Sequence, residues 1–228
     1  MVQKKNNELG SSGFKKTYWN KNYSEPMEMD NIGNAYEHAQ YLKSLFHLEE
    51  VAINSIMDFG FGLGHLSLAM GEIFRPRFFY GIEPSLFAYR ESLKMFAASS
   101  KLYVFKPEQF KQMDLATWAK KSKAKDPVMD LGLCTSVFQY LQDEEIPGIV
   151  EAMALKVRYL YFSVPTINEF KRQKEEYDFF DEYAIHRPCD FYRTEMLKHF
   201  TIVGNRLLES KVHHNFSTSP FREEFYRF

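Results

Sequence analysis

The feature that most constrains this chain is the segment of residues 55–70, which reads SIMDFGFGLGHLSLAM. An apolar run ends in Asp58, and three glycines follow it at alternate positions, Gly60, Gly62 and Gly64. The apolar residues after the last glycine can continue as a helix. A strand, a glycine-rich loop and a helix in this order are typical of an α/β domain that holds a nucleotide. A tight strand-to-helix turn without a ligand is the alternative.

The glycine spacing and Asp58 together favour one kind of nucleotide. Dinucleotide loops usually read G-x-G-x-x-G, because a pyrophosphate sits against the helix N-terminus, whereas this loop reads G-x-G-x-G. A carboxylate two residues before the first glycine would repel a pyrophosphate at close range. It suits S-adenosylmethionine (SAM), which carries an ammonium and a sulfonium but no phosphate. The carboxylate of SAM can still bind backbone N–H groups near the helix start.

The chain on both sides of this loop alternates between helix and strand patterns. A first helix is expected from residue 30 or 31 to about residue 47. Strands are then expected at residues 53–58, 77–83, 102–105, 128–134 and 157–164, with helices at 64–74, 84–98, 110–121 and 143–155. Alternation of this kind gives a parallel sheet covered by helices on both faces.

The last third of the chain has a different character. Residues 167–192 are charged and aromatic, without a clean period of two. Thr194 can cap a short helix that runs through Phe200. Residues 201–208 and 221–228 read as strands, and the polar stretch between them predicts an antiparallel hairpin with a long loop.

Three segments of the sequence resemble one protein family. IMDFGFGLGHLS resembles the first motif of class I SAM-dependent methyltransferases, in which an acid ends the first strand before a G-x-G-x-G loop. A second acid of that family ends the second strand and holds both ribose hydroxyls, and FYGIEPS places Glu83 there, 25 residues after Asp58. MDLGLCTSVFQYL resembles the fourth strand and the loop after it, which face the methionine part of the cofactor and the methyl acceptor.

This resemblance covers about residues 31–166 and the terminal strand pair, and it implies a Rossmann-like methyltransferase fold. We therefore expect an α/β fold with a doubly wound, mostly parallel seven-stranded sheet, helices on both faces and an antiparallel C-terminal strand. Residues 1–29 are expected to be a flexible segment and a candidate flap over the cofactor. Residues 30–228 are expected to form the SAM-binding methyltransferase domain, with 167–192 as the cover of the acceptor site.

The resemblance also implies which residues bind the cofactor. These are Asp58, Gly60, Gly62, Gly64, Glu83, Glu108, Thr135, Ser136 and Tyr18. Several carry an equally open alternative. Glu108 follows the expected third strand, where the family contacts the adenine amino group, but a solvated loop acid fits as well. The carbonyls of Thr135 and Ser136 suit the ligand ammonium, although their hydroxyls could instead cap a turn. Tyr18 and Trp19 suit a flap over the cofactor, and simple packing is the alternative.

The acceptor side of the expected site has two candidate catalytic residues. Methyl transfer depends mainly on proximity and orientation, and a base is needed only for an acceptor that must lose a proton. His186 is the candidate base, because its ordinary pKa lets it act near neutral pH. Tyr140, just past the fourth strand, is expected to orient the acceptor. The aromatic content of residues 167–192 suits a small molecule with an apolar body, and a surface helix with core-facing aromatics is the alternative.

Other features bound the partners. The net charge is -1, and TSVFQY replaces the Asn/Asp-Pro-Pro-aromatic motif of nucleic-acid amino methylases, so nucleic acid is not the expected substrate. No Cys/His spacing suggests a metal site. No apolar run reaches the length of a membrane span, and the start of the chain lacks the apolar core of a signal peptide. Two cysteines fit a reduced compartment, so we expect a cytoplasmic protein.

The function expected from these features is a SAM-dependent methyltransferase that acts on the O or N atom of a small molecule. Two alternatives remain open. One is an NAD-dependent oxidoreductase on a related Rossmann fold, because Glu83 would also suit the ribose hydroxyls of NAD. The other is a SAM-binding protein without transferase activity. The sequence implies no oligomeric state.

Overall fold

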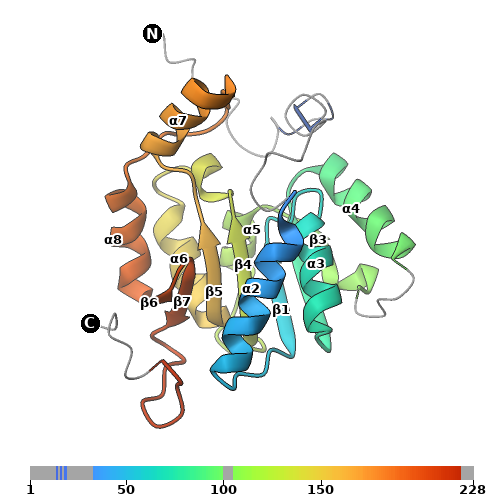
Figure 1. Ribbon diagram of the computed structural model, residues 1–228, viewed down its shortest axis with the longest axis vertical. Helices are drawn as coiled ribbons and strands as arrows, with labels where there is room; N and C mark the ends of the chain where they lie inside the picture. Colours follow the sequence, from blue (N-terminus) through green and yellow to red (C-terminus); the bar gives the residue numbers. More distant parts are fainter. Residues whose placement is uncertain (1–13, 15, 17, 20–32, 100–104, 222–228) are drawn as a thin grey trace.

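A seven-stranded sheet forms the centre of the molecule (Figure 1). The computed structural model describes residues 14, 16, 18–19, 33–99 and 105–221. The strand order is β3-β2-β1-β4-β5-β7-β6. The strands are β1 (Ser55–Phe59), β2 (Phe78–Glu83), β3 (Phe110–Gln112), β4 (Met129–Thr135), β5 (Val157–Ser163), β6 (Phe200–Gly204) and β7 (Leu207–Ser210). All neighbours pair in parallel except β7, which is antiparallel to both β5 and β6.

Helices cover both faces of this sheet, and each face has its own apolar core. One core joins the sheet to α2 (Ala35–Leu48), α3 (His65–Phe74) and α4 (Leu86–Ala98). The other joins it to α5 (Leu115–Lys121), α6 (Ile146–Lys156) and α8 (Cys189–His199). Two cores on opposite faces are the arrangement of a doubly wound sheet, so the predicted fold class is confirmed.

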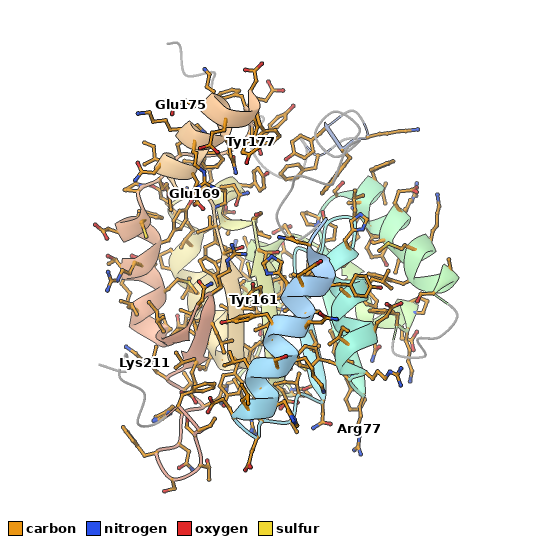
Figure 2. The ribbon with its side chains drawn as sticks, in the orientation of Figure 1. Arg77, Tyr161, Glu169, Glu175, Tyr177 and Lys211 are labelled. Atoms are coloured by element: carbon orange, nitrogen blue, oxygen red, sulfur yellow. The ribbon has the colours of Figure 1, made fainter. Side chains whose placement is uncertain are left out.

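The central strands are apolar because both of their faces are covered. In β1, Ile56 and Phe59 are fully buried and belong to different cores. On β5, Tyr161 is buried under α2 (Figure 2), where its hydroxyl hydrogen-bonds to Nδ1 of His38 at 2.5 Å. Buried polar groups need such partners, and this one ties α2 to the middle of the sheet.

Helix α7 (Ile167–Tyr177) lies beyond the carboxyl end of β5, at the top of Figure 1. It begins with a capping box in which Thr166 and Glu169 each bond the other's backbone N–H, an arrangement that satisfies N–H groups at a helix start. Figure 2 shows Glu169 and Tyr177 on this helix, away from the sheet. Among the described residues, no helix is long and apolar enough to cross a bilayer.

The third strand does not lie where the sequence predicted it. Of residues 102–105 only Phe105 lies within the described residues, and it is not in a strand. Strand β3 instead starts at Phe110, inside the segment predicted as a helix. The reason is packing, since Phe110 is buried against Phe79 and Phe96. The helix begins only after Asp114, whose carboxylate accepts the backbone N–H of Thr117 at 2.7 Å and caps it.

The C-terminal hairpin is also tighter than predicted. Strands β6 and β7 both fall within or beside residues 201–208, which were predicted as a single strand, and a two-residue turn joins them. Arg206 in this turn has a φ of 61°, the left-handed conformation that tight hairpin turns require. Of the second predicted strand, 221–228, only Phe221 lies within the described residues, and it is in a turn, buried against Tyr159. Helix α8 starts at Cys189, five residues earlier than Thr194.

Candidate functional site

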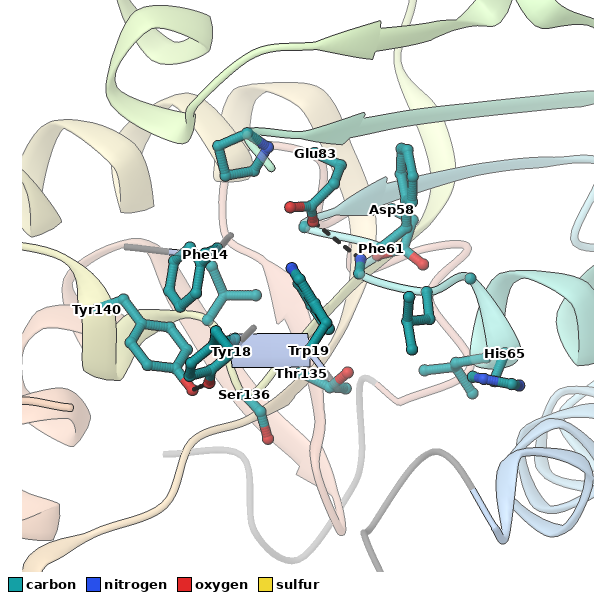
Figure 3. Close-up of a pocket in the computed structure, with 17 residues that line it drawn as sticks. Phe14, Tyr18, Trp19, Asp58, Phe61, His65, Glu83, Thr135, Ser136 and Tyr140 are labelled. Atoms are coloured by element: carbon teal, nitrogen blue, oxygen red, sulfur yellow. Dashed lines mark hydrogen bonds between the residues drawn. The ribbon is translucent and has the colours of Figure 1, made fainter. Parts of the chain in front are cut away.

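A cavity of about 130 Å³ opens at the carboxyl edge of the sheet (Figure 3). The register of the parallel strands creates this edge, because β1 lies between β2 and β4 and all three end on the same side. The cavity is lined by the β1–α3 loop, the end of β2, the loop after β4 and three aromatic residues from the start of the chain. It contains the predicted residues Tyr18, Asp58, Gly60, Gly62, Gly64, Glu83, Thr135, Ser136 and Tyr140.

The glycine loop needs glycine for both conformation and space. Gly60, Gly62 and Gly64 all have positive φ, at 99°, 53° and 82°, a region that favours residues without a Cβ. A Cβ on Gly60 would lie 2.7 Å from a methyl group of Val137. The loop is fixed by the N–H of Gly60, which bonds the carbonyl of Ile82 at 2.9 Å. The loop therefore keeps its backbone close to the cavity.

Asp58 stands at the end of β1 with 4 % of its surface exposed. Burial raises the pKa of this carboxyl to about 7, and a hydrogen bond from Ser67 only partly opposes the effect. The Ser67 hydroxyl belongs to α3, so this bond spans the glycine loop. A buried carboxyl with a raised pKa in a cavity is a common mark of a functional site.

Glu83 ends β2 and faces the same cavity. It accepts the backbone N–H groups of Gly62 at 2.9 Å and Ser85 at 2.8 Å, one on each oxygen. Burial raises its pKa to about 7, the two N–H bonds lower it, and the charge of Asp58 raises it further. A carboxylate offers about four lone-pair sites. Two are used here, so Glu83 can still accept two hydroxyl donors from a ligand.

The loop after β4 forms the next wall of the cavity, with Thr135, Ser136 and Val137. Ser136 has a φ of 55°, which is uncommon for a residue with a Cβ and costs conformational energy. Its N–H donates to the carbonyl of Ser163 at the end of β5, 2.9 Å away, and this bond holds the turn in place. Backbone strain of this kind is frequent at ligand sites.

Aromatic residues from the start of the chain form the remaining wall. The Trp19 indole N–H donates to the hydroxyl of Ser85 at 2.9 Å, and that hydroxyl donates in turn to the carbonyl of Phe14 at 2.7 Å. The Trp19 ring lies close to Gly62, 3.3 Å from the position of an added Cβ. Tyr18 and Trp19 were predicted together as candidates for a flap over the cofactor, and Phe14 lines the cavity beside them. Phe14 was not predicted as a site residue, and its nearness to this aromatic pair was the one signal for it in the sequence.

A buried carboxylate that the sequence did not predict lies behind Tyr140. Asp181 has 4 % of its surface exposed, and its Oδ2 accepts the hydroxyl of Tyr140 at 2.6 Å and that of Tyr18 at 3.2 Å. The two hydroxyls also lie 2.9 Å from one another, and Figure 3 shows Tyr18 and Tyr140 side by side. Asp181 falls inside the predicted cover segment 167–192, where no periodicity indicates which side chains point inward.

Arg187 holds the Tyr140 loop in place. Its guanidinium is almost fully buried and bonds the carbonyls of Phe138 and Leu141 at 3.2 and 2.6 Å. It also pairs with Asp143 at 2.6 Å and donates to the Tyr192 hydroxyl at 3.3 Å. The five donors of a guanidinium in a rigid fork suit this role.

Two predicted residues do not line the cavity. His186 is exposed and stacks on Phe170 of α7, with ring centroids 4.2 Å apart. Burial lowers its pKa, and the charge of Asp181 acts in the opposite direction. Glu108 is exposed in a short 3₁₀ helix, Pro107–Gln109, that precedes β3 instead of following it. The base role of His186 and the adenine contact of Glu108 stay predictions, and the structure gives neither residue a place in the cavity. Within the described residues, no three His, Cys, Asp or Glu side chains form a metal site.

The fold is similar to that of several solved methyltransferases, whereas neither a family model nor a curated protein sequence matches the chain. The plantazolicin methyltransferase BpumL, in complex with a desmethylplantazolicin analogue and S-adenosylhomocysteine (SAH), has a TM-score of 0.61 at 14% identity, over 82% of this chain and 70% of its own. Magnesium protoporphyrin IX methyltransferase from Synechocystis PCC 6803, with bound SAM, has a TM-score of 0.55 at 14% identity, over 90% and 99% of the two chains.

A SAM-dependent methyltransferase from Clostridium acetobutylicum has a TM-score of 0.52 at 11% identity and is matched over 68% of this chain. The present chain spans only 58% of the length of that enzyme. At such low identity the likeness concerns the fold, and it agrees with the strand order and with the antiparallel β7. The chain has the Rossmann-like fold of the class I SAM-dependent methyltransferases.

Proposed function

We propose that this protein is a SAM-dependent methyltransferase and that SAM binds in the cavity at the carboxyl edge of the sheet. The observation that carries the proposal is Glu83, a buried carboxylate beside the glycine loop with two lone-pair sites still available. A ribose offers two neighbouring hydroxyls that fit this need. Solved structures of the same fold contain SAM or SAH, which supports the same ligand here.

Each wall of the cavity has a part to play in holding SAM. Glu83 would accept the ribose hydroxyls, and the glycine loop would let the ligand approach the backbone. Asp58 would supply negative charge near the ammonium and sulfonium groups and would disfavour a pyrophosphate. The carbonyls of Thr135 and Ser136 would accept from the ammonium. When bound, SAM supplies an electrophilic methyl group on a positively charged sulfur.

We propose a small molecule as the methyl acceptor, with O or N as the accepting atom. Tyr18 and Tyr140 line the cavity and bring both aromatic surface and hydroxyl groups to it. The solved structures of similar fold include a magnesium protoporphyrin IX methyltransferase and a plantazolicin methyltransferase. The fold alone therefore does not determine the methyl acceptor. The two free cysteines, Cys134 and Cys189, support a location in the cytoplasm.

Ligand binding tests the cofactor directly. Isothermal titration should show binding of SAM and SAH, with NAD at least ~tenfold weaker, a difference of about 1.4 kcal/mol. Trp19 gives an independent signal, because its ring lies beside Gly62 and the chain has only one other tryptophan. SAH should change the tryptophan emission of the wild type, and Trp19→Phe should abolish that change while SAH still binds. NAD binding equal to or tighter than SAM binding would overturn the proposal in favour of an oxidoreductase.

A second experiment separates an enzyme from a SAM-binding protein without activity. The protein is incubated with SAM carrying a labelled methyl group and with a metabolite extract. Transfer of label to a small molecule, lost in Glu83→Ala, supports the transferase. Tight SAM binding without label transfer to any extract component would favour a binding role.

A further inference from the structure

Asp58 and Glu83 lie on neighbouring parallel strands and point to the same face of the sheet. The register of β1 and β2 pairs Asp58 with Gly81, and Glu83 comes two residues after Gly81, so its side chain is on the same face. Each of the two acids has 4 % of its surface exposed, and both line the cavity. Figure 3 shows both carboxyl groups beside the glycine loop. One wall of the cavity therefore carries two buried acidic groups.

Within the described part of the chain, only neutral donors compensate the charge of this pair. Glu83 accepts two backbone N–H groups, and Asp58 accepts the hydroxyl of Ser67. Neither carboxyl group forms an ion pair with a described lysine, arginine or histidine. Burial raises the pKa of both Cys134 and Glu83, and the charge of Asp58 raises each further. Ionising both acids at once is therefore costly, and a positively charged ligand would lower that cost.

SAM and SAH differ in the property to which such a pair responds. SAM carries a methyl group and a positive charge on its sulfur, whereas the sulfur of SAH is a neutral thioether. A unit positive charge about 6 Å from a carboxylate changes affinity roughly 100-fold at an effective dielectric constant of about 20. Burial of one methyl group changes it only about fourfold. Charge therefore separates the two ligands more strongly than shape does.

We propose that Asp58 and Glu83 together form a charge sensor that selects SAM over SAH, and that binding of SAM releases a proton which binding of SAH leaves in place. The inference rests on the proposed function and states how the same site distinguishes the methyl donor from its product. Glu83 is ionised in both complexes, because it accepts the ribose hydroxyls in both. Asp58 is ionised when the positive sulfur of SAM is present, and in the SAH complex it binds protons as in the free protein. The preference for SAM therefore grows as the pH rises.

The titratable groups around Asp58 decide which of them can produce this pH dependence. Burial raises the pKa of Asp58 to about 7, and the hydroxyl of Ser67 opposes this only in part. The ionisation of Glu83 is needed by both ligands and cancels from their comparison. The remaining titratable groups are His65, Tyr18 and Tyr140 of the cavity lining and Cys134 of β4. Thiols and phenols ordinarily keep their protons below about pH 8. His65, whose pKa burial lowers, is therefore the alternative source of a pH dependence.

Proton counting by calorimetry tests this on the whole protein without a known acceptor. The ligands are SAM, SAH and sinefungin, which carries a protonated amine where SAM has its methylated sulfur. Titrations at about pH 6, where the ligand ammonium groups keep their protons, are made in PIPES and in Bis-Tris, whose protonation enthalpies differ. SAM and sinefungin should each release about half a proton or more beyond SAH. The dissociation constant of SAH divided by that of SAM should rise about tenfold from about pH 5.5 to about pH 7.

Asp58→Asn should remove both effects, since asparagine keeps the shape of the side chain and cannot ionise. The difference in proton release should fall to within about 0.1 proton, and the ratio of dissociation constants should no longer change with pH. Asp178→Asn is the matched control, because Asp178 is exposed at the end of α7, and it should keep both effects. If thermal unfolding shows that Asp58→Asn is not folded, Ser67→Ala takes its place. Loss of the hydroxyl donor should move the rise in the ratio upward by roughly one pH unit, and an unmoved rise would contradict the role of Asp58.

The outcomes separate this inference from the proposed function. Failure of both SAM and SAH to bind the wild type would overturn the two together. Binding of both ligands with equal proton release, or with a difference that survives Asp58→Asn, would overturn the charge sensor alone. A difference that sinefungin does not share would also overturn it, because the methyl group and not the charge would then be recognised. A difference abolished by His65→Gln would assign the titration to His65 instead.

Discussion

The Ser67 hydroxyl donates a 2.6 Å hydrogen bond to the Asp58 carboxylate, and both side chains are buried. The bond joins the end of β1 to the first turn of α3 and so closes the glycine loop between them. It also leaves Asp58 with a pKa near neutrality, because one hydroxyl donor compensates only part of the cost of burying a charge.

Asp58→Asn should therefore change how stability depends on pH. The pKa of folded Asp58 is about 7 against an ordinary 3.8, so the folded protein binds more protons than the unfolded chain between these values. Stability is lost as the pH rises through this window. The free energy of unfolding of Asp58→Asn minus that of the wild type should be on the order of 2 to 4 kcal/mol larger at about pH 8 than at about pH 4. Urea unfolding at both pH values measures this. The prediction is contradicted if this free-energy difference is the same at both pH values. In the control Asp178→Asn, at an exposed residue, the difference should not change with pH.

Glu83→Ala should weaken SAH binding roughly 10- to 100-fold, because hydrogen bonds to a charged group contribute about 1.5–3 kcal/mol each and are not additive. Glu108→Ala is the comparison, since Glu108 is exposed and outside the cavity, and its effect should stay within about twofold. Isothermal titration decides between them. A larger loss of SAH affinity in Glu108→Ala than in Glu83→Ala would contradict a nucleoside site at the end of β2.

The affinity for SAH should rise with pH in the wild type. Glu83 has a pKa of about 7, so only the ionised fraction can accept both ribose hydroxyls, and the apparent dissociation constant is divided by that fraction. Binding should tighten about tenfold from pH 6 to pH 8. In Glu83→Gln the increase should largely disappear. An increase of equal size in the variant would assign the titration to Asp58 instead.

Gly60→Ala and Gly148→Ala should have opposite effects on stability. An alanine at residue 60 would have to adopt a φ of 99°, and its Cβ would lie 2.7 Å from Val137. Strain and overpacking together should lower the free energy of unfolding by roughly 2–4 kcal/mol. Gly148 lies in α6 with nothing within 4 Å of an added Cβ, so alanine there should stabilise by about 0.5–1 kcal/mol. Chemical denaturation of the two variants measures both signs in one experiment.

Arg187→Lys should lower the free energy of unfolding by roughly 1–3 kcal/mol, because a lysine cannot reach the carbonyls of Phe138 and Leu141 together with Asp143. Arg172→Lys is the control, since this exposed arginine makes only a surface pair with Glu176 and should change stability by less than about 0.5 kcal/mol. If both variants unfold at the same denaturant concentration, Arg187 does not hold the Tyr140 loop as inferred.

Sequence reasoning predicted the cavity-lining residues at the strand ends better than the residues that follow β5. Asp58, Glu83 and Thr135 end neighbouring parallel strands, and strand order alone brings such ends to one edge. The position of β3 could not be predicted in this way, because residues 102–105 read as a short strand and 110–121 as a helix, whereas the packing of Phe110 accompanies a strand at 110–112. Tyr140 and Asp181 are 41 residues apart in the sequence, and Asp181 lies in the irregular stretch after α7, where no period indicates the direction of a side chain.

The contact between Trp19 and Ser85 bears on the speed of the proposed reaction. Ser85 caps α4 and bonds both Trp19 and Phe14, so these two residues are held beside the carboxylate that would bind the nucleoside. SAH could leave such a site only after the Trp19 indole has broken its hydrogen bond to Ser85 at the start of α4. The rate of steady-state turnover would then be set by the breaking of this Trp19–Ser85 contact, as in enzymes whose product release is slow. Loosening the Trp19 anchor would raise the maximal rate while letting the nucleoside escape more often before it reacts.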